Sequence, residues 1–102
     1  MIEIVTACGV GMGSSLLLRM YTEDVLKDLG LEARVQALDA SQARGARADL
    51  ILTSPALEEV CSGGKAEVAV IKSFINKAEI RSVLVDFFSS KGLYDVAEDQ
   101  AG

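Results

Sequence analysis

Four short apolar runs alternate along the chain with stretches in which apolar residues recur at helical spacing. The apolar runs span residues 2–7, 33–37, 49–53 and 68–71, and helical periodicity is clearest at 18–29 and 80–88. Strands that alternate with helices predict a parallel sheet covered on both faces. Right-handed crossovers and the edge-like alternation of the second run favour the strand order 2-1-3-4. We therefore expect an α/β fold of three layers, α/β/α, around a four-stranded parallel sheet.

The first apolar run leads into the stretch 7–15, which reads ACGVGMGSS. In a sheet of order 2-1-3-4, the chain leaves strands one and three toward opposite faces. A crevice therefore opens at the carboxyl end of strand one, where such sheets bind ligands. Cys8 is predicted to lie at this crevice.

The glycine-rich loop after Cys8 can present several backbone N–H groups to one point, and the following helix adds partial positive charge. A cysteine at a helix N-terminus has its pKa lowered below the usual ~8.5, which makes it a nucleophile. Ser14 and Ser15 can cap the helix, and their hydroxyls can donate to phosphoryl oxygens. These features predict that Cys8 becomes phosphorylated. The expected phosphate cradle consists of Gly9, Val10, Gly11, Met12, Gly13, Ser14 and Ser15.

Composition excludes several other functions. The 102 residues suit one domain, and the net charge of −5 without a basic block makes nucleic acid an unsuitable partner. No apolar run is long enough to span a membrane, and residues 1–5 contain no cationic secretory segment. We expect a cytoplasmic chain with reduced cysteines, in which Cys61 is a buried structural residue. The sequence contains no histidine, so a Cys-His pair and an imidazole-based zinc site are excluded. Neither a metal nor a cofactor is expected.

Two phosphate-binding loops and one enzyme class compete with this interpretation. The glycines at 9, 11 and 13 do not have dinucleotide spacing, and no lysine closes a P-loop. The small tyrosine phosphatases resemble the chain in carrying a cysteine loop on strand one, but they read Cys-x5-Arg-Ser. Ser14 occupies the arginine position, and residues 72–76 offer no aspartate to protonate a leaving group. The residues that remain suit a phosphoryl carrier.

The Cys-Gly-x-Gly-x-Gly-Ser-Ser loop at residues 8–15 resembles that of IIB components of the bacterial sugar phosphotransferase system (PTS). The loop is most similar to that of the ascorbate branch, and residues 48–54 resemble the third strand and turn of the family. The resemblance covers nearly the whole chain. It implies a Rossmann-like fold, similar to the small tyrosine phosphatases. Residues 1–94 would form the IIB phosphocysteine domain, and residues 95–102 a frayed tail.

The resemblance also implies a function, that of a protein-Nπ-phosphohistidine–sugar phosphotransferase subunit. A phosphohistidine of a IIA protein would phosphorylate Cys8. Cys8 would then phosphorylate a sugar, L-ascorbate or a related sugar or polyol, as it enters through a membrane IIC permease. The chain would have no membrane segment of its own and would associate with the inner face of the membrane through IIC. Two alternatives stay open, a small cysteine-dependent phosphatase and a regulatory IIB-like domain.

Overall fold

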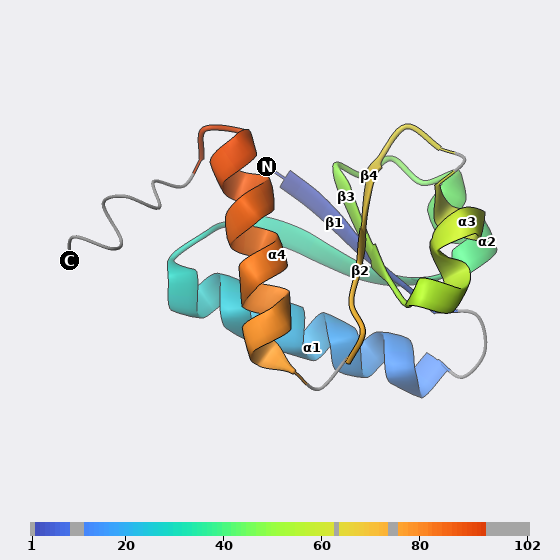
Figure 1. Cartoon of the computed structure of the whole chain (residues 1–102), viewed down its shortest axis with the longest axis horizontal. Coiled ribbons are helices and arrows are strands. Elements are labelled where there is room, and N and C mark those ends of the chain that lie inside the picture. The colour runs from blue at the N-terminus through green and yellow to red at the C-terminus, as the bar shows by residue number, and fades with distance from the viewer. Residues whose placement is uncertain (1, 9–11, 63, 74–75, 94–102) are drawn as a thin grey trace.

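The computed structural model describes residues 2–8, 12–62, 64–73 and 76–93, with the backbone alone at residues 8 and 12–15. Strands and helices alternate as the sequence predicts (Figure 1). The elements are β1 (Ile2–Cys8), α1 (Met12–Leu29), β2 (Ala33–Asp39), α2 (Ala40–Arg44), β3 (Leu50–Thr53), the 3₁₀ turn η1 (Pro55–Leu57), α3 (Glu58–Cys61), β4 (Glu67–Val70) and α4 (Lys77–Ser90).

The four strands form one parallel sheet in the order β2-β1-β3-β4. The predicted α/β fold and its strand order are therefore confirmed. At the carboxyl edge of the sheet, Cys8 pairs in register with Asp39 of β2. The preceding residue, Ala7, pairs with Thr53 of β3, and Thr53 pairs with Val70 of β4.

Two separate apolar cores cover the two faces of the sheet, which gives the predicted three layers. Helices α1 and α4 pack together on one face, and α2 and α3 pack on the other (Figure 1). Successive residues of β3 serve opposite cores, because Leu50 and Leu52 face the first pair of helices while Ile51 faces the second. Burial on both faces explains why the residues 50–52 form a continuous apolar run rather than an alternating one.

Helix α1 ends at Leu29, the last residue of the predicted helical pattern at 18–29, and Gly30 follows it. This glycine has a φ of 71°, a left-handed conformation that glycine adopts without steric cost. Its N–H donates to the carbonyl of Lys27 and the next N–H, of Leu31, donates to the carbonyl of Leu26. This pair of bonds is the Schellman motif, which satisfies carbonyls left free at a helix end.

Other boundaries differ from the expected ones by small amounts. The short helix that we expect from the sequence at 56–61, after the apolar run 49–53, is divided into η1 and α3, and β4 begins one residue before the predicted run at 68–71. The expected tail at 95–102 lies outside the described residues. Among the helices of the described chain, none is long and apolar enough to cross a membrane.

Candidate active site

The backbone brings the predicted site residues to one end of the sheet. Strand β1 ends at Cys8 in the middle of the sheet, and α1 begins four residues later at Met12 (Figure 1). The chain continues from β1 through α1 to the edge strand β2, whereas β3 lies on the other side of β1. Cys8 therefore occupies the position at which the strand order reverses, as predicted.

The residues of the expected phosphate cradle are described only in part. Met12, Gly13, Ser14 and Ser15 form the first turn of α1, where a helix has N–H groups without intrahelical partners. Gly9, Val10 and Gly11 lie outside the described residues. The contacts of the cradle with a phosphoryl group thus stay a prediction from the sequence.

Side-chain hydrogen bonds connect the end of β1 to both neighbouring strands. The hydroxyl of Thr53, which is fully buried, donates to the carbonyl of Ala7 at 3.1 Å. On the other side, the hydroxyl of Thr6 lies 3.5 Å from the carbonyl of Gln36, to which it donates. The residues that precede Cys8 are therefore fixed to β2 and β3 by side chains as well as by the backbone ladders.

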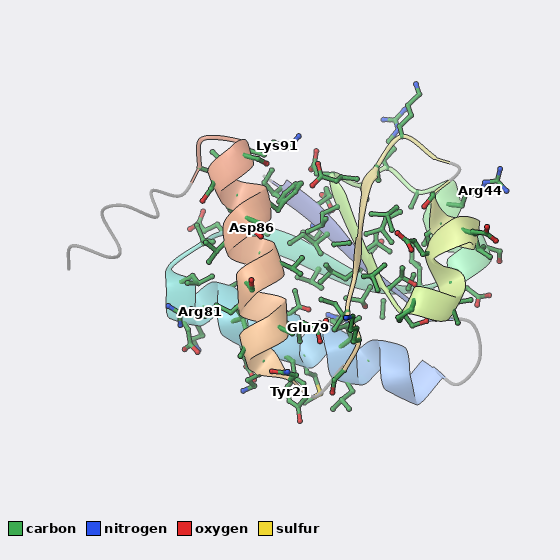
Figure 2. The ribbon with its side chains drawn as sticks, in the orientation of Figure 1. Tyr21, Arg44, Glu79, Arg81, Asp86 and Lys91 are labelled. Atoms are coloured by element: carbon green, nitrogen blue, oxygen red, sulfur yellow. The ribbon has the colours of Figure 1, made fainter. Side chains whose placement is uncertain are left out.

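The segment after β4 is fixed by a carboxylate that the sequence analysis did not identify. Glu79, on the first turn of α4 (Figure 2), accepts hydrogen bonds from the N–H of Lys72 at 2.7 Å and of Ser73 at 3.0 Å. The N–H of Glu79 in turn donates to the side chain of Asn76, the N-cap of α4, at 3.2 Å. The spacing Asn-x-x-Glu before an apolar helix is similar to a capping box and indicates the Asn76 cap, but not the bonds from the Glu79 carboxylate to residues 72 and 73.

The charges at this edge differ in how they are paired. Lys77 contacts the carboxylate of Asp24 on α1 at 3.2 Å and lies over the ring of Tyr21, 5.1 Å from its centroid. Lys72 is exposed, and its ammonium has no carboxylate within 4 Å among the described residues. Asp39, next to Cys8 in the sheet, makes no side-chain hydrogen bond to the helix that it precedes.

Cys61 has the structural role that the sequence predicts. It is a free thiol with no exposed surface, at the end of α3. It packs in the core formed by Val5, Ala7 and Ile51. A small apolar environment of this kind does not activate a thiol.

A cavity lies at the opposite, amino-terminal edge of the sheet. Its volume is about 580 Å³, and it is lined by Glu3, Arg44, Gly45, Ala46, Arg47, Ala48, Asp49, Gly64 and Lys65. None of the predicted site residues lines it. Within the described ranges, no group of three or more His, Cys, Asp or Glu side chains could hold a metal ion.

Comparison with known proteins points to one family. The family model described as "PTS system, Lactose/Cellobiose specific IIB subunit" matches residues 3–86. The chain is also 35% identical over 86 residues to the "Ascorbate-specific PTS system EIIB component" of Mycoplasma pneumoniae. That alignment covers 81% of this chain and 90% of the relative.

Proposed function

The chain belongs to the lactose/cellobiose-type IIB family of the PTS, and on that premise we propose that it is a phosphoryl carrier whose acceptor is Cys8. The observation that carries the proposal is the position of Cys8 at the carboxyl end of a central strand, four residues before α1 begins. We assign this function to residues 1–94, which include the whole of the family match.

The start of α1 supplies the electrostatics that the acceptor needs. Backbone N–H groups of its first turn and the positive end of the helix dipole favour an anion in front of the helix. The same groups lower the pKa of a nearby thiol and stabilise the charge of a bound phosphoryl group. We propose that Gly9 to Ser15 cradle the phosphoryl group during both transfers.

In the first transfer, the Cys8 thiolate attacks the phosphorus of a phosphohistidine on IIA. An S–P bond forms and the N–P bond breaks, and its electron pair stays on the imidazole nitrogen, which takes a proton from solvent. In the second transfer, a sugar hydroxyl oxygen attacks the same phosphorus. An O–P bond forms, the hydroxyl proton leaves to solvent, and the S–P electron pair returns to Cys8 as thiolate. Positioning and charge stabilisation supply most of the catalysis in such displacements.

The relative from Mycoplasma pneumoniae suggests the sugar. That relative is named as ascorbate-specific, and the alignment spans most of both chains. We therefore propose that the phosphoryl group is passed to L-ascorbate or a related sugar or polyol carried by a IIC permease. The chain would work in the cytoplasm, at the inner face of the membrane, between IIA and IIC.

The phosphatase alternative is weaker because the loop lacks its cation. Ser14 stands where the small tyrosine phosphatases have an arginine that clamps phosphate. We expect no rapid hydrolysis of p-nitrophenyl phosphate by the wild type. Rapid turnover that depends on Cys8 would contradict the carrier function and support a phosphatase.

The second alternative is a regulatory IIB-like domain. Such a domain would not be phosphorylated at Cys8 by a phospho-IIA protein, so the experiment described next also tests this alternative.

The test is phosphorylation by a phospho-IIA protein of the ascorbate branch, read by intact-protein and peptide mass spectrometry. We expect one phosphoryl group on the wild type, located at Cys8, and none on Cys8→Ser. The matched control is Cys61→Ala, which should still accept the group because Cys61 lies in the core away from α1. A phosphoryl group on Cys61 or Ser14 of the wild type, or none at all, would overturn the assignment.

A further inference from the structure

Positive charge is scarce at the carboxyl edge of the sheet. The four residues that follow each strand are Gly9–Met12, Ala40–Ala43, Ser54–Leu57 and Ile71–Phe74. Lys72 is the one cation in these four segments. A phosphoryl group on Cys8 would carry close to two negative charges at this edge.

A continuous set of hydrogen bonds connects Lys72 to the strand that ends in Cys8. The Thr53 hydroxyl donates to the carbonyl of Ala7, and the carbonyl of Thr53 accepts from the N–H of Ile71 at 2.8 Å. The next two N–H groups, of Lys72 and Ser73, donate to the Glu79 carboxylate. Glu79 thus sets the direction in which the chain leaves β4, and with it the place from which the Lys72 side chain extends.

The Lys72 ammonium is available for a ligand, unlike that of Lys77, the next lysine along the chain. Lys77 is engaged by Asp24 at 3.2 Å. The Glu79 carboxylate is occupied by two backbone N–H groups, and no ion pair to Lys72 occurs within the part of the chain that the structure describes. The charge of Lys72 is therefore not neutralised by a direct contact within the described residues.

The distances across the sheet allow an electrostatic interaction. Cys8 ends β1, and Lys72 lies two residues past the end of β4, with β3 between the two strands, so their backbones are separated by a span of ~10 Å at the usual strand spacing. A lysine side chain directed along this edge would cover a large part of this span. The remaining gap is comparable to or less than the Debye length of ~8 Å at physiological ionic strength. The carboxylate of Asp39, next to Cys8 in the sheet, repels a negatively charged phosphoryl group. A cation at this edge would offset that repulsion.

We propose that the Lys72 ammonium is the countercharge for the phosphoryl group on Cys8, and that Glu79 is the positioning residue that holds Lys72 there. This inference rests on the proposed function of Cys8. It assigns to a lysine after the last strand the electrostatic role that an arginine in the cysteine loop has in the phosphatases. Because the cation lies outside the loop, the loop remains free for contact with two successive partners.

The first test measures the rate of phosphoryl transfer from phospho-IIA. We expect Lys72→Met to be slower than the wild type by about five- to tenfold, as one charge at such a distance acts on a dianion. Lys72→Arg should retain most of the rate. The matched control is Lys65→Met, because Lys65 lies two residues before β4 as Lys72 lies two residues after it. Lys65→Met and Lys72→Met change the net charge equally. Because Lys65 lies at the amino-terminal edge, away from Cys8, Lys65→Met should leave the rate of phosphoryl transfer unchanged.

The second test measures the pKa of the Cys8 thiol from the pH dependence of its alkylation. The variants carry Cys61→Ala in addition, so that Cys8 is the thiol that is alkylated. Lys72→Met should raise the thiol pKa by about half a unit, because a cation that favours the thiolate is lost. Asp39→Asn should lower the thiol pKa, because an anion next to Cys8 is removed. Loss of structure alone does not produce shifts of opposite sign.

Glu79→Gln separates positioning from direct electrostatics. If Glu79 acted only by its charge, removal of that anion would lower the thiol pKa and speed phosphorylation. If it positions Lys72, the variant should instead resemble Lys72→Met, and the double variant should lose little more than either single one. Folding of each variant is checked by urea unfolding, and rates are compared only for variants that are folded.

The outcomes separate the two proposals. If the wild type accepts no phosphoryl group, the proposed function fails. If the wild type is phosphorylated at Cys8 but Lys72→Met is as fast as Lys65→Met, the proposed function stands and the Lys72 inference is overturned. A faster Glu79→Gln would overturn the positioning role.

Discussion

The two edges of the sheet carry charge in different ways. The amino-terminal edge has the cavity of about 580 Å³, bordered by Arg44, Arg47 and Lys65 and by two carboxylates. Arg44 points outward from the end of α2 (Figure 2). The carboxyl edge has Cys8, the Lys77 ammonium that pairs with Asp24, and Lys72, which makes no ion pair among the described residues. The edge that has the three cations of the cavity is thus not the one at which Cys8, the proposed phosphoryl acceptor, lies.

The direction of the elements explains this difference. In a parallel sheet with crossover helices, helices begin near the carboxyl edge and end near the amino-terminal edge. Free N–H groups therefore gather at the edge with Cys8, and free carbonyls at the other. At the amino-terminal edge the carboxylates are also engaged, since Asp49 accepts from the N–H of Glu3 at 2.8 Å and Glu3 pairs with Arg34 at 3.6 Å. We therefore expect the proposed phosphoryl site to depend on the helix starts more than on the number of cations.

The largest expected effect on stability lies at the amino-terminal edge. A Cβ at Gly64 would overlap the carbonyl oxygen of Arg44, which is backbone and cannot rotate away. We expect Gly64→Ala to lower the free energy of unfolding by about 2 kcal/mol. Urea unfolding measures this loss. Phosphorylation of the folded variant at Cys8 should be unchanged.

The control for this prediction is Gly45→Ala at the same edge. No atom lies within 4 Å of a Cβ at Gly45, and its φ of −95° suits any residue. The change in unfolding free energy should stay within about 0.5 kcal/mol. If Gly64→Ala slowed phosphorylation while Gly45→Ala did not, the two edges would be coupled and the contrast between them would fail.

The second prediction concerns the carboxyl edge. Thr53→Val keeps the side-chain volume but removes the hydroxyl that donates to Ala7. We expect a loss of about 1 kcal/mol in unfolding free energy. Because this bond connects β3 to the residue before Cys8, the amide resonance of Cys8 should shift and phosphorylation should slow.

Thr22→Val is the matched control for Thr53→Val. Thr22 is equally buried, but its hydroxyl donates to the carbonyl of Leu18 one turn earlier in α1, at 2.7 Å. We expect Thr22→Val to lower the unfolding free energy by the same amount as Thr53→Val or by less. The amide resonance and the phosphorylation of Cys8 should not change. Equal effects of both variants on phosphorylation would show that general stability, rather than the Thr53 contact, controls the site.

Local sequence signals predicted much of this architecture. Gly30 follows the last apolar residue of a helical pattern, so the end of helix α1 could be predicted from its neighbours alone. Cys61 lacks a glycine loop, so its burial as a structural residue could be predicted in the same way. The strand order followed from the rule for right-handed crossovers together with the edge-like pattern of residues 33–37. The position of Cys8 then followed from the order.

The supporting contacts of the site could not be predicted in the same way. Thr53 and Ala7 are 46 residues apart, and their contact depends on the register of β1 with β3, which no local pattern specifies. Asn76 and Glu79 carry a local capping signal, but the carboxylate binds the N–H groups of residues 72 and 73 because of the path that the chain takes after β4. Tertiary packing determines such paths.

The smallest expected effect is that of Lys77→Met, which tests whether two lysines at one edge have different roles. The Lys77 and Asp24 side chains are 49% and 56% exposed, so water and salt screen their pair. We expect a loss of about 0.5 kcal/mol in unfolding free energy, which disappears in 1 M salt. Phosphorylation should be unchanged, because the charge of Lys77 is held by Asp24. If Lys77→Met slowed phosphorylation as much as Lys72→Met, any cation near this edge would suffice, and the special position of Lys72 would be contradicted.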